Sequence, residues 1–261
     1  MPTKKEYVGN FRDLIAYQKA LLFRKEIYEI VKTIPCSERF IMNELRKASC
    51  SICANLAEGN GNYYYGREFE HFDIALCKLV KCQSILDLVF SMGYVEEEKY
   101  NRLQDSAKEI ARIIHALMNR IEGYCTSEVD LRKDCSNKIT NVTNTETPIE
   151  EAKKFQKEII NMVRTLPEEE SCNLVDQMNR AVSSIYENLI KSIGVISDRR
   201  FQELNYSIGS VSEVRSFLDI CVTENFITIE EFCDFDEEAD YVQTALIIEM
   251  QEITNQLKEC L

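Results

Sequence analysis

Few side chains in this sequence have the types and the spacing that chemistry at a functional site requires. The only histidines are His71 and His115, both in the first half of the 261-residue chain. Glu68 and His71 have the spacing of one half of a di-iron site in a helical bundle, but such a site needs a second Glu-x-x-His pair. The second half contains no histidine, so the chain cannot complete this site. The sequence therefore predicts no metal site and no cofactor.

Cysteine is common, with 11 in the chain, and Cys50 and Cys53 form a C-x-x-C pair. A zinc site needs two more ligands at a matching spacing, and a thioredoxin-like motif belongs to a βαβ unit. This pair falls within a helical pattern, where a free cysteine acts as a small apolar residue, so we expect core packing. The chain also lacks a nucleophile elbow and a phosphate-binding glycine loop. The sequence predicts no enzyme and no small-molecule substrate.

Two groups of residues in the first half are candidates for contact with a partner. Five basic residues would form a stripe if two neighbouring helices present them together: Arg39, Arg46, Lys47, Lys78 and Lys81. Such a stripe would bind phosphate groups, although solvated surface charges would give the same pattern. Tyr63, Tyr64 and Tyr65 lie in a predicted turn, where aromatic rings either cap the core or form a contact patch.

The elements that position these residues are predicted to be long helices. The chain has only 8 Gly and 4 Pro, which leaves few places to turn. Apolar residues recur every three or four positions in four segments of the first half: 13–33, 37–59, 66–93 and 96–121. Pro35 ends the first segment, Ser37 is expected to cap the second, and Gly59 and Gly93 are expected to end the second and third. Such short connections force neighbouring helices to run antiparallel, which predicts an up-down four-helix bundle.

The second half repeats the first at an offset of 132 or 133 residues. Residues 30–35, IVKTIP, match residues 162–167, MVRTLP, and residues 51–56, SICANL, match residues 184–189, SIYENL. Asn225 matches Gly93 and is the other residue that tolerates the left-handed conformation. These matches predict a tandem duplication. A duplicated bundle can mimic a twofold dimer, in which each copy covers the same face of the other.

Asn55 and its match Asn188 occupy the same helical position in the two copies. One interpretation is a pair of recognition residues. The other, which we favour, is a polar group that hydrogen-bonds across helices and fixes their register, as a buried Asn does in coiled coils. In the second copy Asn179 replaces Arg46 and Arg180 replaces Lys47, so half of that basic pair is lost there.

The formal net charge of −13 is unevenly distributed, with −1 on residues 1–130 and −12 on residues 131–261. Phosphate contacts dominate nucleic-acid affinity, so an acidic second copy leaves nucleic-acid binding to the first copy alone. The N-terminal residues do not resemble a signal peptide, and no apolar stretch approaches the roughly 20 residues of a membrane span. We therefore expect a cytoplasmic protein with reduced cysteines and no membrane contact.

The second predicted helix carries a recognisable motif. Residues 44–59, ELRKASCSICANLAEG, resemble the pattern Q-L-R-R-A-x-x-S-I-x-x-N-I-A-E-G of the 23S rRNA intervening-sequence four-helix bundle proteins. Residues 11–14, FRDL, resemble the opening of that family, and the resemblance extends over residues 11–123. The second copy keeps Ser184, Ile185 and Asn188 but loses the Ala-Glu-Gly end, so the internal repeat assigns it.

The resemblance implies a small helical bundle that self-associates and, for most family members, has no established activity. Similar proteins include the accessory variability proteins of diversity-generating retroelements, which form a pentameric barrel and bind a reverse transcriptase and its RNA through basic surfaces. This chain departs from them in its duplication, its acidic second copy, and the residues 62–65, NYYY, that replace basic residues after the turn.

Together these observations predict an all-α protein built from two tandem antiparallel up-down four-helix bundles. The expected divisions are a first bundle in residues 1–125, a Ser/Thr/Asn-rich linker in 126–147 and a divergent acidic bundle in 148–261. The expected function is non-catalytic binding or assembly through a protein partner or self-association. The alternative is a nucleic-acid or ribonucleoprotein accessory factor, associated with a reverse transcriptase and RNA, in which the first copy makes the contact.

Overall fold

The computed structural model describes residues 9–125, 148–195 and 197–259, which form eight α-helices and no strand. The helices follow one another along the chain as α1 Ile15–Val31, α2 Arg39–Gly61, α3 Tyr65–Ser91, α4 Glu97–Ile121, α5 Pro148–Val163, α6 Asp176–Ile193, α7 Ser197–Thr223 and α8 Ile229–Glu259. The protein is therefore all-α, as the sequence predicts. In this part of the chain, no helix combines the length and the apolar character that crossing a membrane requires.

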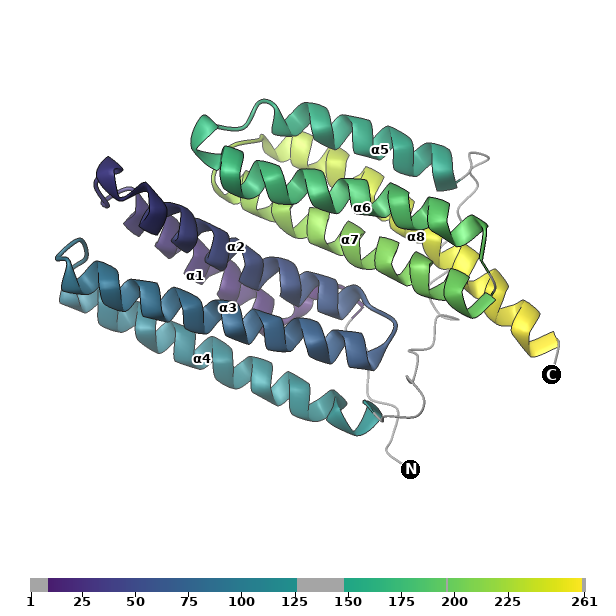
Figure 1. The fold of residues 1–261 in the computed structure, drawn as a ribbon, viewed down its shortest axis with the longest axis horizontal. Helices are drawn as coiled ribbons and strands as arrows, with labels where there is room; N and C mark the ends of the chain where they lie inside the picture. The colour runs from purple at the N-terminus through teal and green to yellow at the C-terminus, as the bar shows by residue number, and fades with distance from the viewer. Residues whose placement is uncertain (1–8, 126–147, 196, 260–261) are drawn as a thin grey trace.

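The helices form two antiparallel four-helix bundles, one from α1 to α4 and one from α5 to α8 (Figure 1). Within each bundle successive helices pack together, and the last helix returns to the first, α4 against α1 and α8 against α5. The predicted linker, residues 126–147, lies outside the described residues.

The third helix of each bundle ends in the same way. Gly93 has a φ of 74° and Asn225 a φ of 59°, so both adopt the left-handed conformation that the sequence predicts. The following residues complete the motif, because the amide of Tyr94 donates to the carbonyl of Val89 and the amide of Phe226 donates to that of Cys221. This shared ending is a local sign of the duplication.

The ends of α2 differ from the prediction. Ser37 lies in the 3₁₀ turn Cys36–Glu38 and makes no capping bond, and α2 begins only at Arg39. The helix also continues past Gly59 to Gly61, because these glycines serve close packing rather than helix termination. A Cβ on Gly59 would lie 3.1 Å from the ring of Phe72, and one on Gly61 would lie 2.3 Å from Ser212 Oγ in the second bundle.

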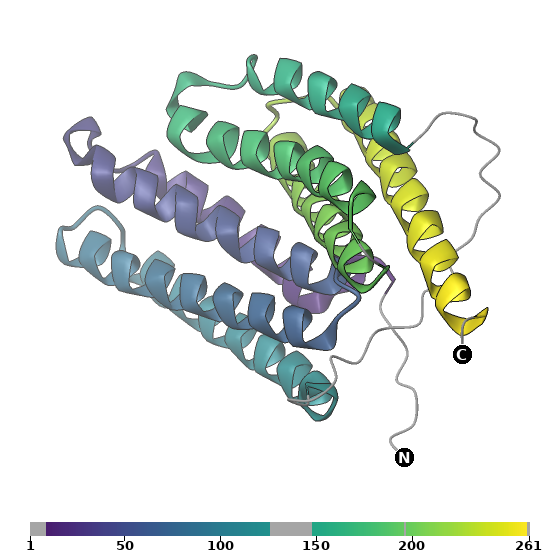
Figure 2. The same cartoon turned by 45° about the vertical axis from the view of Figure 1, so that its right-hand side comes forward.

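The two bundles pack against each other through α2 and α7, which lie side by side (Figures 1 and 2). Beyond its first turn α7 is buried or half-buried on all sides, because it belongs to the core of its own bundle and also lies on α1 and α2. In the predicted twofold arrangement α3, the counterpart of α7, would be covered in the same way by α5 and α6, the counterparts of α1 and α2. Val80 and Leu88 of α3 instead remain 61% and 46% exposed, so the interface joins different faces of the two copies.

Candidate functional site

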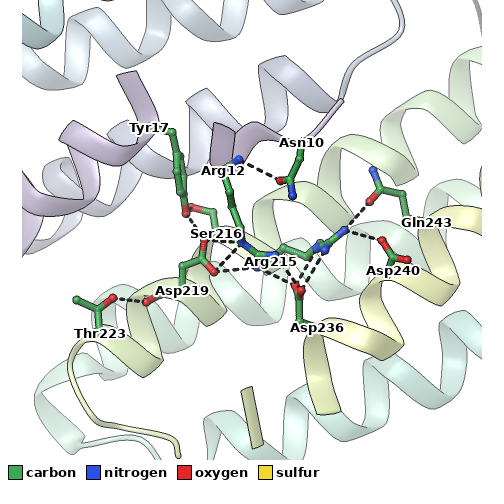
Figure 3. A network of polar contacts seen from close by, with 10 residues as sticks. All are labelled: Asn10, Arg12, Tyr17, Arg215, Ser216, Asp219, Thr223, Asp236, Asp240 and Gln243. Carbon is green, nitrogen blue, oxygen red and sulfur yellow. Dashed lines mark hydrogen bonds and ion pairs between the residues drawn. The ribbon is translucent and has the colours of Figure 1, made fainter. Parts of the chain in front are cut away.

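Charged side chains hold the interface between the bundles, and Arg12, just before α1, makes many of these contacts (Figure 3). Its Nε donates to both carboxylate oxygens of Asp219 at 3.0 Å. Its terminal nitrogens donate to both oxygens of Asp236 at 2.8 and 2.7 Å. The Tyr17 hydroxyl donates to Asp219 at 2.8 Å, and Arg215 donates to Asp236 at 2.8 and 3.0 Å. This network connects the start of the first bundle to α7 and α8.

The ionisation of this network follows from its pairing. Burial lowers the pKa of Arg12, but hydrogen bonds to Asp236 and Asp219 outweigh that effect and raise it. Burial raises the pKa of Asp219, against the opposing bonds from Arg12 and Tyr17. For Asp236 burial is outweighed by hydrogen bonds from Arg12 and Arg215, which lower its pKa. Arg12 therefore stays charged, and the network is suited to holding the bundles together.

A second charged cluster lies at the other end of α1. Arg24 forms an ion pair with Glu224, which directly follows α7. Arg46 of α2 lies with its Nε 3.5 Å from a carboxylate oxygen of Glu170 in the second bundle. The guanidinium groups of Arg24 and Arg46 lie 4.7 and 5.5 Å from the centre of the Tyr28 ring. Opposite charges and cation–π contacts thus offset part of the lost hydration of two buried arginines.

The two clusters give the interface opposite charges on its two sides. The first bundle contributes cations and the second contributes carboxylates: Arg12, Arg24 and Arg46 on one side, and Glu170, Asp219, Glu224 and Asp236 on the other. Part of the acidity of the second copy therefore faces the first copy and is not available to an outside partner.

Polar contacts also connect the far ends of α2 and α7. Asn205 Nδ2 donates to Asn62 Oδ1 at 2.7 Å, and the amide of Tyr63 donates to Asn205 Oδ1 at 2.7 Å. The Tyr64 ring packs edge-on against Phe201 of α7, with ring centres 5.7 Å apart. Tyr63 and Tyr64 are buried and contact the second bundle, so they are not an exposed patch. Tyr65 differs, because it is half-buried and stacks on Tyr124, with ring centres 4.8 Å apart.

A cleft of about 600 Å³ lies between the bundles, lined by α2 and α3 on one side and by α6 and α7 on the other. We call it the inter-bundle cleft. It gathers Lys47, Lys78 and Lys81 from the first bundle and Arg180 from the second. Lys81 forms an ion pair with Glu44 at the edge of the cleft. Three of the five basic residues of the predicted stripe are therefore together, with a fourth cation from the other copy.

Two glutamates of the cleft come from opposite bundles, Glu58 from α2 and Glu213 from α7. Burial raises the pKa of each to about 7. His71 Nε2 lies 3.5 Å from Glu58 and counteracts part of the rise, as Arg180 does for Glu213. Near neutral pH each carboxyl group is thus partly protonated.

The remaining residues of the predicted basic stripe lie elsewhere. Arg46 is 6% exposed and pairs with Glu170, so it contacts the second bundle and not an outside partner. Arg39 is exposed at the first residue of α2 and does not line the inter-bundle cleft. The stripe is divided because α2 is covered by α7, which the sequence of the first copy alone does not reveal.

The matched asparagines make different contacts. Asn55 Nδ2 donates to the carbonyl of Ser51, one turn earlier, and its Oδ1 lies 3.2 Å from Nδ1 of His71 on α3. Asn188 Nδ2 donates to Ser184 Oγ within the same helix, and its Oδ1 accepts a bond from Lys191. A bond across helices is therefore present for Asn55, whereas Ser184 and Lys191, the partners of Asn188, lie on α6 itself.

Cys50 and Cys53 are fully buried, and burial raises the pKa of both thiols. They lie on α2 between the two bundles rather than at a surface, which suits packing and not thiolate chemistry. Across the described ranges, no group of three or more His, Cys, Asp or Glu side chains is arranged to hold a metal ion.

A protein-family model, that of the 23S rRNA-intervening sequence protein, matches residues 12–116 and 147–247. The chain belongs to this family. The two matched segments correspond to the two bundles, so the chain is a tandem duplication of the family domain. No curated protein and no solved structure matches the chain.

The charged residues of the interface between the bundles were missed by motif analysis, although the sequence contains a signal for one of them. Arg24 lies seven residues after Tyr17, on the same apolar side of the helical pattern. A charge on that side predicts a buried ion pair. Its partner could not be named, because Glu224 is 200 residues away in the sequence.

Proposed function

We propose that this protein is a non-catalytic assembly protein whose chains join head to tail, through copies of the interface that joins its two bundles. The observation that carries the proposal is a row of exposed, mainly apolar residues on α3 and at the residue that follows it. We call it the α3 stripe, and it comprises Cys77, Val80, Ser84, Leu88 and Met92. Val80, Leu88 and Met92 are 61%, 46% and 39% exposed, an apolar exposure that is typical of an interaction surface.

The α3 stripe occupies the repeat positions of the α7 surface that packs on the first bundle. At an offset of 132 residues it corresponds to Gly209, Ser212, Ser216, Ile220 and Glu224. In that row Ser212 lies against Gly61, Ser216 accepts a hydrogen bond from Tyr17, and Glu224 pairs with Arg24. The same helix position is thus used inside the chain by the second copy and is uncovered in the first.

The face that receives α7 has an uncovered counterpart as well. Four buried positions of α2 have repeat matches at an offset of 133 residues, on α6 and at the residue that follows it. We call these matches the α6 face: Ser183, Tyr186, Ile190 and Gly194, which match Cys50, Cys53, Ala57 and Gly61. On the α6 face Ile190 is 41% exposed, and the adjacent Ile193 is 59% exposed. Each chain therefore presents one donor surface and one acceptor surface of the same interface.

Compared with the interface within the chain, the two uncovered surfaces have lost a pair of opposite charges. Glu224 of the covered interface corresponds to Met92 in the α3 stripe, and its partner Arg24 corresponds to Gln156 of α5. Both charges are therefore lost together, which would leave no unpaired ion if the two surfaces met. Ser212 is likewise replaced by Val80, so the proposed interface between chains would be more apolar than the one within the chain.

A second copy of this chain is the occupant that these surfaces fit. Within one chain the α3 stripe and the α6 face do not cover each other, because the α3 stripe is exposed, as are Ile190 and Gly194 of the α6 face. An interface between two different faces joins chains in series, and the series ends by closing into a ring or continues as a filament.

The test uses two complementary variants studied by sedimentation velocity. Val80→Glu with Leu88→Glu blocks the α3 stripe, and Ile190→Glu with Ile193→Glu blocks the α6 face. We expect the unmodified chain to form oligomers and each variant alone to be monomeric. An equimolar mixture of the two should form a dimer, because one unblocked donor meets one unblocked acceptor. Leu22→Glu, at a residue of α1 that is 64% exposed, is the matched control and should leave the oligomer intact.

The mixture separates this proposal from other modes of association. A twofold contact between two α3 stripes would instead make the variant with the blocked α6 face dimeric on its own. Loss of folding in either variant, which circular dichroism detects, would leave the mixture monomeric. A monomeric unmodified chain at all concentrations, or a mixture without dimers, would refute head-to-tail assembly.

The alternative of nucleic-acid binding through the first copy receives less support from the geometry. Arg46 is buried, Lys81 is paired with Glu44, and the remaining lysines share their cleft with three glutamates. Binding that is carried by phosphate contacts weakens steeply with salt, whereas apolar assembly does not. Retention of RNA through a low-salt but not a moderate-salt wash would favour this alternative.

A further inference from the structure

We infer that the inter-bundle cleft binds a small phosphorylated molecule, in a site to which both bundles contribute. This inference does not depend on the proposed assembly, because neither the α3 stripe nor the α6 face lines the cleft. A volume of about 600 Å³ lies within the range of roughly 300–1,000 Å³ that small-molecule sites occupy.

The cations of the cleft are suited to an anion with more than one negative charge. Lys47, Lys78 and Arg180 reach the cleft from three different helices, α2, α3 and α6. Arg180 also pairs with Asp176 of its own helix at 3.0 Å, in an exposed ion pair that contributes little. Lys47 and Lys78 form no ion pair with any described residue. One unpaired ammonium group from α2 and one from α3 thus line the same cleft. Such a pair is typical of phosphate recognition, where lysine acts as a point charge.

Hydroxyl groups supply the neutral part of the site. Ser51 of α2, Ser184 of α6 and Ser210 of α7 line the same cleft, and the last two hydrogen-bond each other at 3.0 Å. Ser51 and Ser184 are repeat matches, as are Lys47 and Arg180. The two copies thus present the same helix face from opposite sides, so the duplication creates a site that a single bundle lacks.

Three glutamates line the cleft, and two of them, Glu58 and Glu213, limit the size and extension of the ligand, while Glu44 pairs with Lys81. Glu58 is flanked by His71, Arg67 and Glu70 of α3 and by Glu213, while Glu213 is influenced by Arg180. Partial protonation allows these carboxyl groups to donate hydrogen bonds to a compact ligand. A long polyanion that passed through the cleft would instead meet both carboxylates, which favours a small phosphorylated molecule over a nucleic-acid strand.

Isothermal titration calorimetry of the full chain with inorganic triphosphate tests the site. We expect binding by the unmodified protein and a loss of about tenfold or more in affinity for Lys47→Ala with Lys78→Ala, because hydrogen bonds to charged groups are lost. Lys153→Ala with Lys157→Ala removes the same charge from exposed positions of α5 and should leave the affinity unchanged. Circular dichroism of each variant establishes that it is folded.

A parallel titration with a short single-stranded RNA identifies the class of ligand. Triphosphate binding that depends on Lys47 and Lys78, with no tighter binding of RNA, supports the inference. Absence of triphosphate binding, equal loss in the control variant, or RNA binding that exceeds triphosphate binding would overturn it.

Discussion

Arg24 of α1 and Glu224 after α7 form an ion pair that joins the two bundles while their side chains are only 1% and 5% exposed. Burial raises the pKa of Glu224, against the opposing charge of Arg24. Two charges taken out of water at this depth are tolerated because each is the partner of the other. The bundles are thereby held in one relative position, since sliding α1 along α7 would separate the pair.

Removing one partner of this pair is expected to destabilise the protein strongly. Arg24→Met should lower the free energy of unfolding by about 3–5 kcal/mol, because Glu224 would remain buried without a counter-charge. Urea denaturation followed by circular dichroism measures this change. The matched control is Glu29→Gln, which breaks an exposed pair with Lys32 and should cost about 0–1 kcal/mol. An equal effect of the two substitutions would show that the buried pair has no special role.

Replacing both partners separates the charge from the packing. Arg24→Met combined with Glu224→Leu should recover most of the stability, because no unpaired charge remains. The double variant keeps the volume at the interface approximately constant. If it remains as unstable as Arg24→Met alone, the loss comes from the stacking of Arg24 on Tyr28 and not from the ion pair.

Close approach of α2 and α7 gives a second prediction. A Cβ on Gly61 would lie 2.3 Å from Ser212 Oγ, so Gly61→Ala requires Ser212 or α7 to shift. We expect a loss of about 1–3 kcal/mol in the free energy of unfolding, as for other overpacked sites. Gly123→Ala is the control, because no heavy atom outside its neighbours lies within 4 Å of the added Cβ. Ser212→Gly removes the clashing side chain, so Gly61→Ala should cost less in a Ser212→Gly background than in the unmodified chain. An equal cost in both backgrounds would place the strain elsewhere.

The helices and their arrangement in bundles could be predicted from the sequence, whereas the interface could not. Helix periodicity is local, and the left-handed ends at Gly93 and Asn225 require only the residue type. The interface joins residues such as Arg12 and Asp219, which are 207 positions apart. A buried arginine such as Arg46 has the same sequence pattern as a solvated one, so its partner, Glu170, becomes visible only when both bundles are placed.

Two half-buried glutamates of the inter-bundle cleft, Glu58 and Glu213, predict a pH dependence of stability. In the folded chain the pKa of Glu58 and of Glu213 is about 7, above the 4.5 of an unperturbed glutamate. Between these values the folded state holds more protons than the unfolded state, so these groups lower stability as the pH rises from about 4.5 to about 7. At about pH 7 these groups are still partly protonated in the folded state, and only above about pH 8 are both states ionised and the loss complete.

Glu58→Gln with Glu213→Gln removes this dependence. Relative to the unmodified chain, the double variant should be more stable at about pH 8 and show little gain at about pH 5. Each unit of pKa difference corresponds to about 1.4 kcal/mol, and the 25% exposure of Glu58 reduces its share. A hydrogen bond to Glu238 is the main cause that raises the pKa of Glu158 to about 7, so this group titrates in the same pH range. Glu158→Gln therefore serves as the comparison for a glutamate outside the inter-bundle cleft. A constant difference between variant and unmodified chain across this pH range would contradict the assignment.

The matched helix ends allow the cost of the left-handed conformation to be measured twice in one protein. Gly93→Ala should lower the free energy of unfolding by about 1–2 kcal/mol, because a Cβ is strained at a φ of 74°. Asn225→Ala should cost a similar or smaller amount, while Asn225→Gly should be neutral or slightly stabilising at a φ of 59°. Gly194→Ala is the control, because Gly194 also lies at a helix end but has a φ of −96°, at which a Cβ causes no strain. Thermal denaturation of the four variants distinguishes the outcomes, since equal effects at Gly93 and Gly194 would mean that backbone strain does not distinguish the two sites.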